Sequence, residues 1–222
     1  MRSSAASDVY KRQELKIPGL DNILFTSTEA NENNRPQLIV TNKISLASPI
    51  QSLSFEFVCL NGNGEASYMT DWKNSSYAQS ISFTGCAIQN IKRTLVRISD
   101  GSGVFMTDIT IDNCVISEVG TDGYGMINFG KNIDQLEKVS ITNSTLINIG
   151  DQLMDVKGGI GDVILENCTF YNSMDAKKEL PKVFRFDNAA STPPSPKSAT
   201  MRNLIFSGPN KGCLLYTSPS PR

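Results

Sequence analysis

Between residues 80 and 173 the chain repeats a pattern of alternating apolar and polar residues at intervals of 28, 30 and 24 residues. Each copy opens with an apolar–polar–apolar alternation, which is typical of a β-strand with one buried side. A Gly or Asn interrupts the alternation, and a second short apolar pair follows. The copies are SISFTGCAIQNI from Ser80, DITIDNCVISEV from Asp108, KVSITNSTLINI from Lys138 and DVILENCTFYNS from Asp162. Such self-similarity indicates a stacked-repeat architecture.

Asparagine recurs at the points where each copy must change direction. Asn113, Asn143 and Asn167 share one column, and Gly85 takes this place in the first copy. Asn tolerates the left-handed backbone conformation of a sharp corner, and stacked Asn side chains can hydrogen-bond to one another. A third strand is predicted after each copy, at LVRIS, MINFG, LMDVK and VFRFD. The sequence therefore predicts an all-β fold, a right-handed parallel β-helix with three short strands per coil. A leucine-rich horseshoe is disfavoured because its Leu-x-x-Leu-x-Leu spacing is missing.

The two ends of the chain differ from the repeats. Residues 3–13 (SSAASDVYKRQ) and 213–222 (CLLYTSPSPR) resemble the translation of adaptors used to prepare sequencing libraries. Residues 8–13 and 214–218 can be read from complementary strands of one oligonucleotide. We therefore expect non-native segments at 1–13 and 213–222 of a fragment from a longer protein. Between them we expect irregular coils and a loop at 14–79, and regular coils at 80–212.

Composition argues against several functional classes. The chain has 21 Lys and Arg, 22 Asp and Glu and no His, which gives a net charge of −1. This balance does not favour nucleic acid, which selects a basic surface. No apolar run approaches the length of a membrane-spanning helix. Cys86, Cys114 and Cys168 share an inward column, so we expect them to be buried packing residues and predict no metal site.

The third strands place polar residues on their outward side. One outward column contains Arg97, Asn128, Asp155 and Arg185, and the next contains Ser99, Gly130, Lys157 and Asp187. Arg binds carboxylates through two parallel hydrogen bonds, and a deprotonated Lys or Arg can start β-elimination of a uronate. Candidate catalytic residues are Lys157, Arg97 and Arg185, and candidate substrate-binding residues are Asn128, Asp155 and Asp187. The alternative is a surface ladder of ion pairs that keeps the sheet soluble.

Aromatic residues offer a second candidate surface for binding. Residues 61–77 are predicted to form a long Gly- and Asn-rich loop that carries the only tryptophan, Trp72. Tyr124 lies in another predicted loop, TDGY, beside the outward columns. Aromatic faces stack on sugar rings, so Trp72 and Tyr124 are candidate substrate-binding residues. The alternatives are an aromatic side chain packed over the end of the solenoid for Trp72, and a simple Gly-rich turn for TDGY.

The repeats ITIDNCVISEVG, VSITNSTLINIG and VILENCTFYNS resemble the pectate-lyase-like superfamily. More narrowly, they are similar to β-helix domains of secreted lipoproteins from glycan-degrading bacteria. The resemblance covers residues 80–207 and extends loosely over 14–79. It implies a role in binding or cleaving polysaccharides, commonly polyuronates, with calcium as a candidate cofactor. The superfamily's Asp-Asp, Gly-His-Gly and Arg-x-Pro-x-x-Arg motifs are missing from this sequence, so the resemblance transfers no catalytic residue.

These observations predict an extracytoplasmic β-helix protein, monomeric, that binds or cleaves an acidic polysaccharide, with β-elimination as the candidate reaction. The alternative is a non-catalytic glycan-binding, adhesin or spacer module. A segment of a phage tail spike is a third alternative, which trimeric assembly would indicate. An open groove among Arg97, Asp155, Lys157 and Arg185 would favour the first interpretation, and a closed ladder of ion pairs would favour the second.

Overall fold

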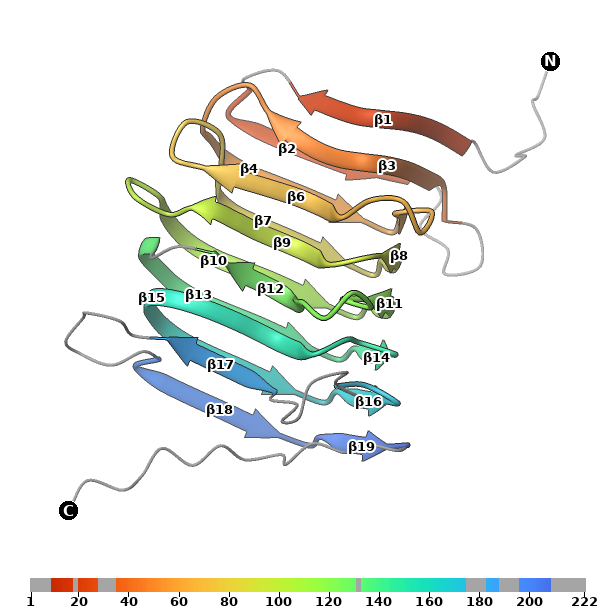
Figure 1. Ribbon diagram of the computed structural model, residues 1–222, viewed down its shortest axis with the longest axis vertical. Coiled ribbons are helices and arrows are strands. Elements are labelled where there is room, and N and C mark those ends of the chain that lie inside the picture. Colours follow the sequence, from red (N-terminus) through yellow and green to blue (C-terminus); the bar gives the residue numbers. More distant parts are fainter. Residues whose placement is uncertain are drawn as a thin grey trace.

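The computed structural model describes residues 9–17, 20–27, 35–130, 133–174, 183–187 and 196–208. These residues form strands and turns and contain no helix, and thus none long and apolar enough to cross a membrane. The strands pair in parallel, and each coil stacks on the one before it, from β1 (Val9–Ile17) to β19 (Ile205–Ser207) (Figure 1). The prediction of an all-β parallel β-helix is confirmed.

Each coil contributes strands to three faces of the solenoid. The first face contains β2 (Asn22–Thr26), β4 (Ile50–Glu56), β7 (Ala78–Thr84), β10 (Phe105–Asp112), β13 (Ile133–Thr142), the second half of β15 (Gln152–Glu166) and β18 (Ser198–Arg202). The second face contains the first halves of β1 and of β3 (Gln37–Leu46), and β5 (Cys59–Asn61), β8 (Ala87–Ile91), β11 (Val115–Val119), β14 (Thr145–Ile147), β16 (Thr169–Tyr171) and β19. The third face contains the second halves of β1 and β3, then β6 (Tyr68–Lys73), β9 (Thr94–Asp100), β12 (Gly125–Phe129), the first half of β15 and β17 (Phe184–Asp187).

The register of the first face reproduces the sequence repeat. Ile81 pairs with Ile109, Ile109 with Val139, and Val139 with Val163. The same register extends back to Leu53, which pairs with Ile81, so in-register stacking begins before residue 80. At the other end, β1 spans both sides of the boundary expected between residues 13 and 14 and pairs with β3. The expected non-native residues 1–8 and 213–222 lie outside the described residues.

Apolar side chains from the three faces converge on the axis of the solenoid. The rings of Phe25, Phe55 and Phe83 stack, with centroids 5.1 and 5.3 Å apart in successive coils. Burying such columns is the main favourable contribution to folding. The predicted inward column is also confirmed: Cys86, Cys114 and Cys168 are buried free thiols.

The predicted corners are present, and they carry the expected backbone conformation. Values of φ are +60° at Gly85, +51° at Asn113, +50° at Asn143 and +54° at Asn167. Asn167 donates from Nδ2 to Oδ1 of Asn143 at 3.0 Å, and Asn143 donates to Oδ1 of Asp112 at 2.8 Å. A second column with positive φ, at the other end of the second face, contains Asn90, Glu118, Asn148 and Asn172. The amide ladders expected from the sequence therefore link successive coils.

The expectation of a loop throughout residues 61–77 is wrong. Strand β6 lies within this range and pairs with β9 on the third face. Its register places Trp72 beside Ile98, and the indole is completely buried. Trp72 is therefore a core residue of the third face, out of reach of a sugar ring on the surface.

Candidate functional site

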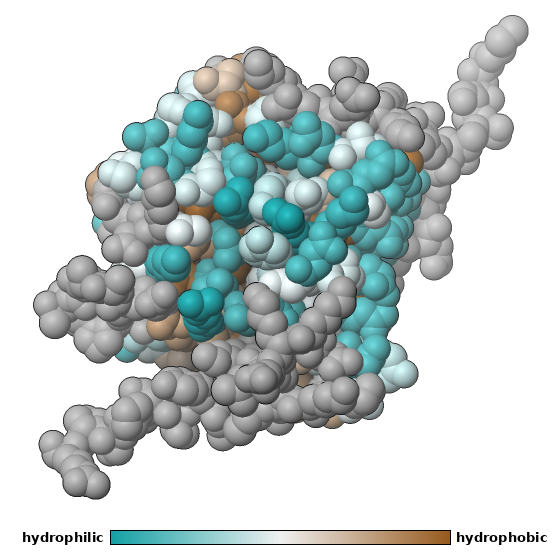
Figure 2. Space-filling model, viewed as in Figure 1, coloured by the Kyte–Doolittle hydropathy of each residue, from teal (hydrophilic) through white to brown (hydrophobic). Residues whose placement is uncertain are grey.

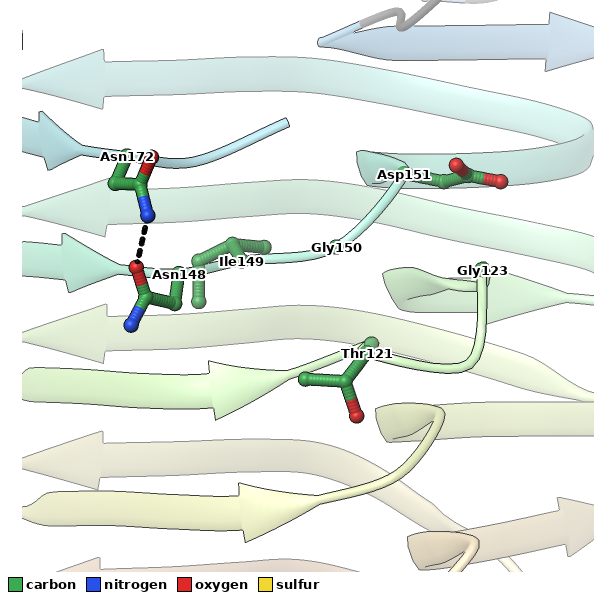
Figure 3. Close-up of a pocket in the computed structure, with 8 residues that line it drawn as sticks. Thr121, Gly123, Asn148, Ile149, Gly150, Asp151 and Asn172 are labelled. Atoms are coloured by element: carbon green, nitrogen blue, oxygen red, sulfur yellow. Dashed lines mark hydrogen bonds between the residues drawn. The ribbon is translucent and has the colours of Figure 1, made fainter. Parts of the chain in front are cut away.

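A groove lies at the corner between the second and third faces, just after β11 and β14. Its volume is about 260 Å³, and it is lined by Gly120, Thr121, Gly123, Asn148, Ile149, Gly150, Asp151 and Asn172 (Figure 3). We call it the corner groove. Drug-sized ligands occupy pockets of roughly 300–1,000 Å³, so this groove suits a single ring of a longer ligand. It includes Thr121 and Gly123 of the predicted loop TDGY, and the loops on one face of a solenoid are often its binding face.

Glycine lets two coils approach each other closely at the floor of the groove. A Cβ atom at Gly150 would lie 1.8 Å from the carbonyl oxygen of Gly120. Gly150 also donates its N–H to the carbonyl of Val119 at 2.8 Å. Only a residue without a side chain fits at this point of contact. The sequence signal for this close approach is a Val-Gly pair at the end of β11 and an Ile-Gly pair just beyond β14.

The walls of the corner groove carry amide and carboxylate groups. Asn172 donates from Nδ2 to Oδ1 of Asn148 at 2.7 Å, and Asn148 donates in turn to Glu118. Asp151 begins the following segment of the third face, and this residue is only 4% exposed. Figure 3 shows the two Asn side chains at one side of the groove and Asp151 at the other. These oxygen atoms accept hydrogen bonds from hydroxyl groups, which are what a sugar presents. Asp151 was not among the residues selected from the sequence.

A row of two tyrosines and an arginine extends from the groove along the solenoid. Tyr124 follows the groove residue Gly123 and is 39% exposed. The guanidinium of Arg93 lies over the Tyr124 ring, with Cζ 4.7 Å from the centroid, and its Nη1 donates to the Tyr68 hydroxyl at 3.0 Å. The hydrogen bond to Tyr68 raises the pKa of Arg93, so its positive charge is retained. We call Tyr68, Arg93 and Tyr124 the stacked row.

The structure also brings together the residues of the outward column predicted on the third face. Asn128 pairs in register with Arg97 on one side and with Asp155 on the other, and Asp155 pairs with Arg185. The face in view in Figure 2 carries mostly hydrophilic residues in its described part. The sequence predicted this alignment because side chains alternate along a strand and parallel strands stack in register.

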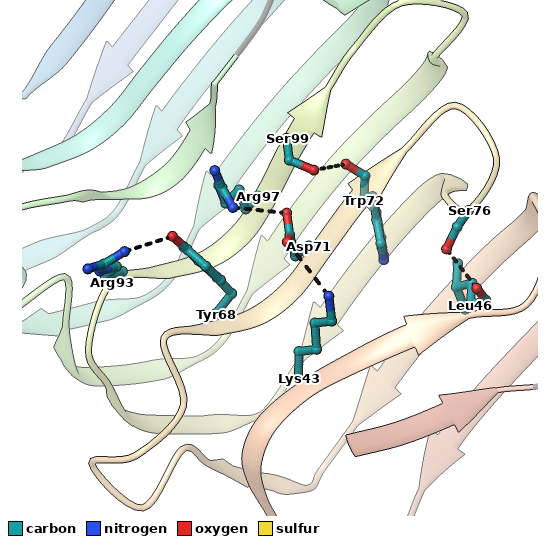
Figure 4. Close-up of polar contacts among 9 residues, drawn as sticks. All are labelled: Lys43, Leu46, Tyr68, Asp71, Trp72, Ser76, Arg93, Arg97 and Ser99. Carbon is teal, nitrogen blue, oxygen red and sulfur yellow. Dashed lines mark hydrogen bonds and ion pairs between the residues drawn. The ribbon is translucent and has the colours of Figure 1, made fainter. Parts of the chain in front are cut away.

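Within this column the charged residues contact one another. Nη1 of Arg97 lies 3.3 Å from Oδ1 of Asp71, whose Oδ2 lies 3.8 Å from Nζ of Lys43 (Figure 4). Nε of Arg185 lies 3.8 Å from Oδ1 of Asp155. The column is therefore closed by ion pairs at these positions. The sequence does not single out Asp71, because the predicted loop at 61–77 covers its strand, although YMTDWK aligns its Asp with the Arg of TLVRIS.

Asn128 contributes to the same column, and it is largely buried. Its Nδ2 donates to Oδ2 of Asp155 at 3.2 Å. Lys157 lies in register with Asp187, as expected, but the side chain of Asp187 lies outside the described part of the chain. The roles assigned from the sequence to Lys157, Arg97, Arg185, Asn128, Asp155 and Asp187 stay predictions.

Calcium is the one cofactor that the resemblance suggests. Calcium binds roughly six to eight oxygen atoms, mainly from carboxylates. Over the described ranges no three Asp, Glu, His or Cys side chains come together as metal ligands, and the corner groove has one lining carboxylate, Asp151. Calcium stays a prediction from the resemblance, and no step of the proposed function depends on it.

The fold and the site define a parallel β-helix protein with a polar groove at one corner and an ion-paired outer face. The family model described as Domain of unknown function (DUF4957) matches residues 25–149. Because this range covers more than half of the 222 residues, the chain belongs to that family. The range that the family model matches contains Tyr124 and the part of the corner groove that its first coils form. The chain matches none of the curated proteins and none of the solved structures.

Proposed function

We propose that this protein binds a polysaccharide at the corner groove, with Tyr124 beside the bound sugar. The observation that supports the proposal is the combination, at one corner, of a groove sized for a ring, hydrogen-bonding groups and an exposed tyrosine. Hydrogen-bonding groups suit the hydroxyls of a sugar, and an aromatic surface suits the C–H face of its ring. The resemblance noted in the sequence supports the same ligand class and a location outside the cytoplasm.

Binding without cleavage is the function that the geometry supports best. The predicted β-elimination needs a free base and cations that neutralise the substrate carboxylate. Arg97 and Arg185 instead contact Asp71 and Asp155, which agrees with the alternative of a surface ladder. We therefore propose a glycan-binding module and keep β-elimination as an outcome that the same experiment detects.

Affinity gel electrophoresis of the full chain tests the proposal, with polygalacturonate, alginate or chondroitin cast in the gel. We expect retardation by at least one of these glycans. Removal of the aromatic ring in Tyr124→Ala should weaken binding roughly two- to tenfold, since an aromatic contact contributes about 0.5–1.5 kcal/mol. Tyr171→Ala is the matched control, because Tyr171 is 52% exposed on the second face. Equal loss in both variants, or no retardation of the unmodified chain, would contradict the proposal.

Ultraviolet absorbance of the same glycan mixtures, with and without calcium, reports any unsaturated uronate product. Absorbance that rises with the unmodified chain and not with Lys157→Ala would establish a lyase, and the binding-only proposal would then be wrong. A constant absorbance together with retardation on the gel would support the binding module.

A further inference from the structure

Arg93, just before β9, differs from Arg97 and Arg185 of the third face in having no carboxylate at ion-pair distance among the described residues. Arg97 and Arg185 each lie within ion-pair distance of a carboxylate, at 3.3 and 3.8 Å. Over the described ranges no carboxylate lies this close to Arg93, although Asp122 is near enough to contribute to its raised pKa. The contacts of Arg93 are the Tyr68 hydroxyl and the aromatic rings of Tyr68 and Tyr124. Its charge is therefore held in place without being neutralised.

The guanidinium of Arg93 also has an unused donor. Its Nε is buried and has no hydrogen-bond partner among the described residues. Because this atom is buried while the residue as a whole is only partly buried, a ligand meets the guanidinium through its Nη groups. A charged guanidinium suits an anionic acceptor better than a neutral hydroxyl.

Arg93 lies in line with the corner groove. Ile127 pairs in register with Val96 and with Met154, and Arg93, Tyr124 and Asp151 each precede these residues by the same number of positions. The three residues therefore occupy equivalent places in successive coils, which are about 4.8 Å apart. A polysaccharide that follows the axis of the solenoid can contact the corner groove and Arg93 at the same time.

We infer that Arg93 is the residue that selects an acidic glycan, by binding the carboxylate of a uronic acid unit. The inference rests on the proposed binding of a polysaccharide at the corner groove. Tyr124 holds the guanidinium plane by a cation–π contact, so the arginine is ordered before the ligand arrives. A carboxylate accepts from two N–H groups of a guanidinium at once, whereas a methyl ester carries no charge and is a weaker acceptor. Arg93 thus distinguishes a uronate from its neutral ester.

Two glycans with one backbone test the inference. Polygalacturonate and highly methyl-esterified pectin are each cast in affinity gels, and retardation of the full chain gives the affinity for each. We expect Arg93→Gln to bind polygalacturonate roughly 10- to 100-fold more weakly, the range for losing a charge-assisted hydrogen bond, and to bind the esterified pectin as before. Arg93→Lys keeps the charge without the planar fork and should lie between the two. Arg202→Gln is the matched control, because Arg202 is exposed on the first face and pairs with Glu166.

The possible outcomes separate this inference from the proposed function. Retardation of the unmodified chain by polygalacturonate, with equal retardation of Arg93→Gln, would overturn the role of Arg93 and leave glycan binding intact. An equal loss of affinity for both glycans would show that Arg93 maintains the site without distinguishing a charged from a neutral glycan, which also overturns the inference. If neither glycan retards the unmodified chain, the proposed function and the inference both fail. Thermal unfolding of each variant, expected to be unchanged, confirms that folded proteins are being compared.

Discussion

Asn143 allows a direct test of why asparagine occupies the corners. Its φ is +50°, its Nδ2 donates to Asp112 at 2.8 Å, and its Oδ1 accepts from Asn167 at 3.0 Å. Two substitutions separate the backbone conformation from the amide ladder. Asn143→Gly removes both hydrogen bonds and adopts a positive φ without strain. Asn143→Ala removes the same bonds and also forces a Cβ atom into the left-handed region.

The contacts of Asn143 set the expected size of each effect. Its side chain is exposed, so we assign each hydrogen bond the lower part of the usual range, about 0.5–1 kcal/mol. Left-handed backbone costs an alanine roughly 1–2 kcal/mol, whereas a glycine costs about 0.5–1 kcal/mol through the entropy of the unfolded chain. Asn143→Ala should therefore lower the free energy of unfolding by about 2–4 kcal/mol, and Asn143→Gly by about 1.5–3 kcal/mol.

Thermal and urea unfolding, monitored by circular dichroism, show which of the two variants is the more stable. Asn128 provides the control pair, because it lies in the extended strand β12 and not at a corner. In a strand, the glycine variant should be less stable than the alanine variant. The order of stability of the Gly and Ala variants at Asn128 should therefore be opposite to the order at Asn143. If Asn143→Ala were as stable as Asn143→Gly while the Asn128 pair behaved as expected, positive φ would not be the reason for asparagine at the corner.

Three further predictions follow from burial and charge. Trp72→Ala should lower the free energy of unfolding by about 3–5 kcal/mol, the cost of a large core cavity; an unchanged melting temperature would contradict its burial. Burial raises the pKa of the Cys168 thiol, so stability is fully present below pH 9.0, the ordinary thiol value, and falls as the pH rises above it. Cys168→Ser should flatten this alkaline decline in urea midpoints. Asp71→Asn should cost about 1 kcal/mol or less, since its partners Lys43 and Arg97 are partly solvated; a loss of several kcal/mol in urea unfolding would show that the ladder stabilises the fold.

The features that the sequence predicts correctly are those that each coil repeats. The Asn columns and the outward column of Arg97, Asn128 and Asp155 follow from two local rules, alternation along a strand and in-register stacking of parallel strands. Each rule acts within one coil or between neighbouring coils, so a repeat of the pattern is enough to reveal it. The same rules explain why the buried cysteine column could be recognised.

The features that the sequence did not predict depend on departures from the repeat. Strand β6 has Thr70 where β9 has Val96, and Asp71 where β9 has Arg97, so its resemblance to a third strand is weak. Without that strand, Trp72 could not be assigned to the core. The stacked row is harder still, because Arg93 and Tyr124 precede their strands, where no alternation fixes the direction of a side chain. Backbone geometry at the corner, which glycine makes possible, decides those contacts.

The ion pairs of the third face bear on where an acidic ligand can bind. A carboxylate that approached Arg97 would have to displace Asp71 or bind beside it, and the two like charges would repel each other. The same holds for Arg185 and Asp155. Among the residues that the structure describes, no carboxylate lies within ion-pair distance of Arg93, and the Tyr124 ring packs against its guanidinium. In this solenoid the ion pairs of Arg97 and Arg185 neutralise charge on the flat third face, so recognition of an acidic ligand is more favourable at the corner that carries Arg93.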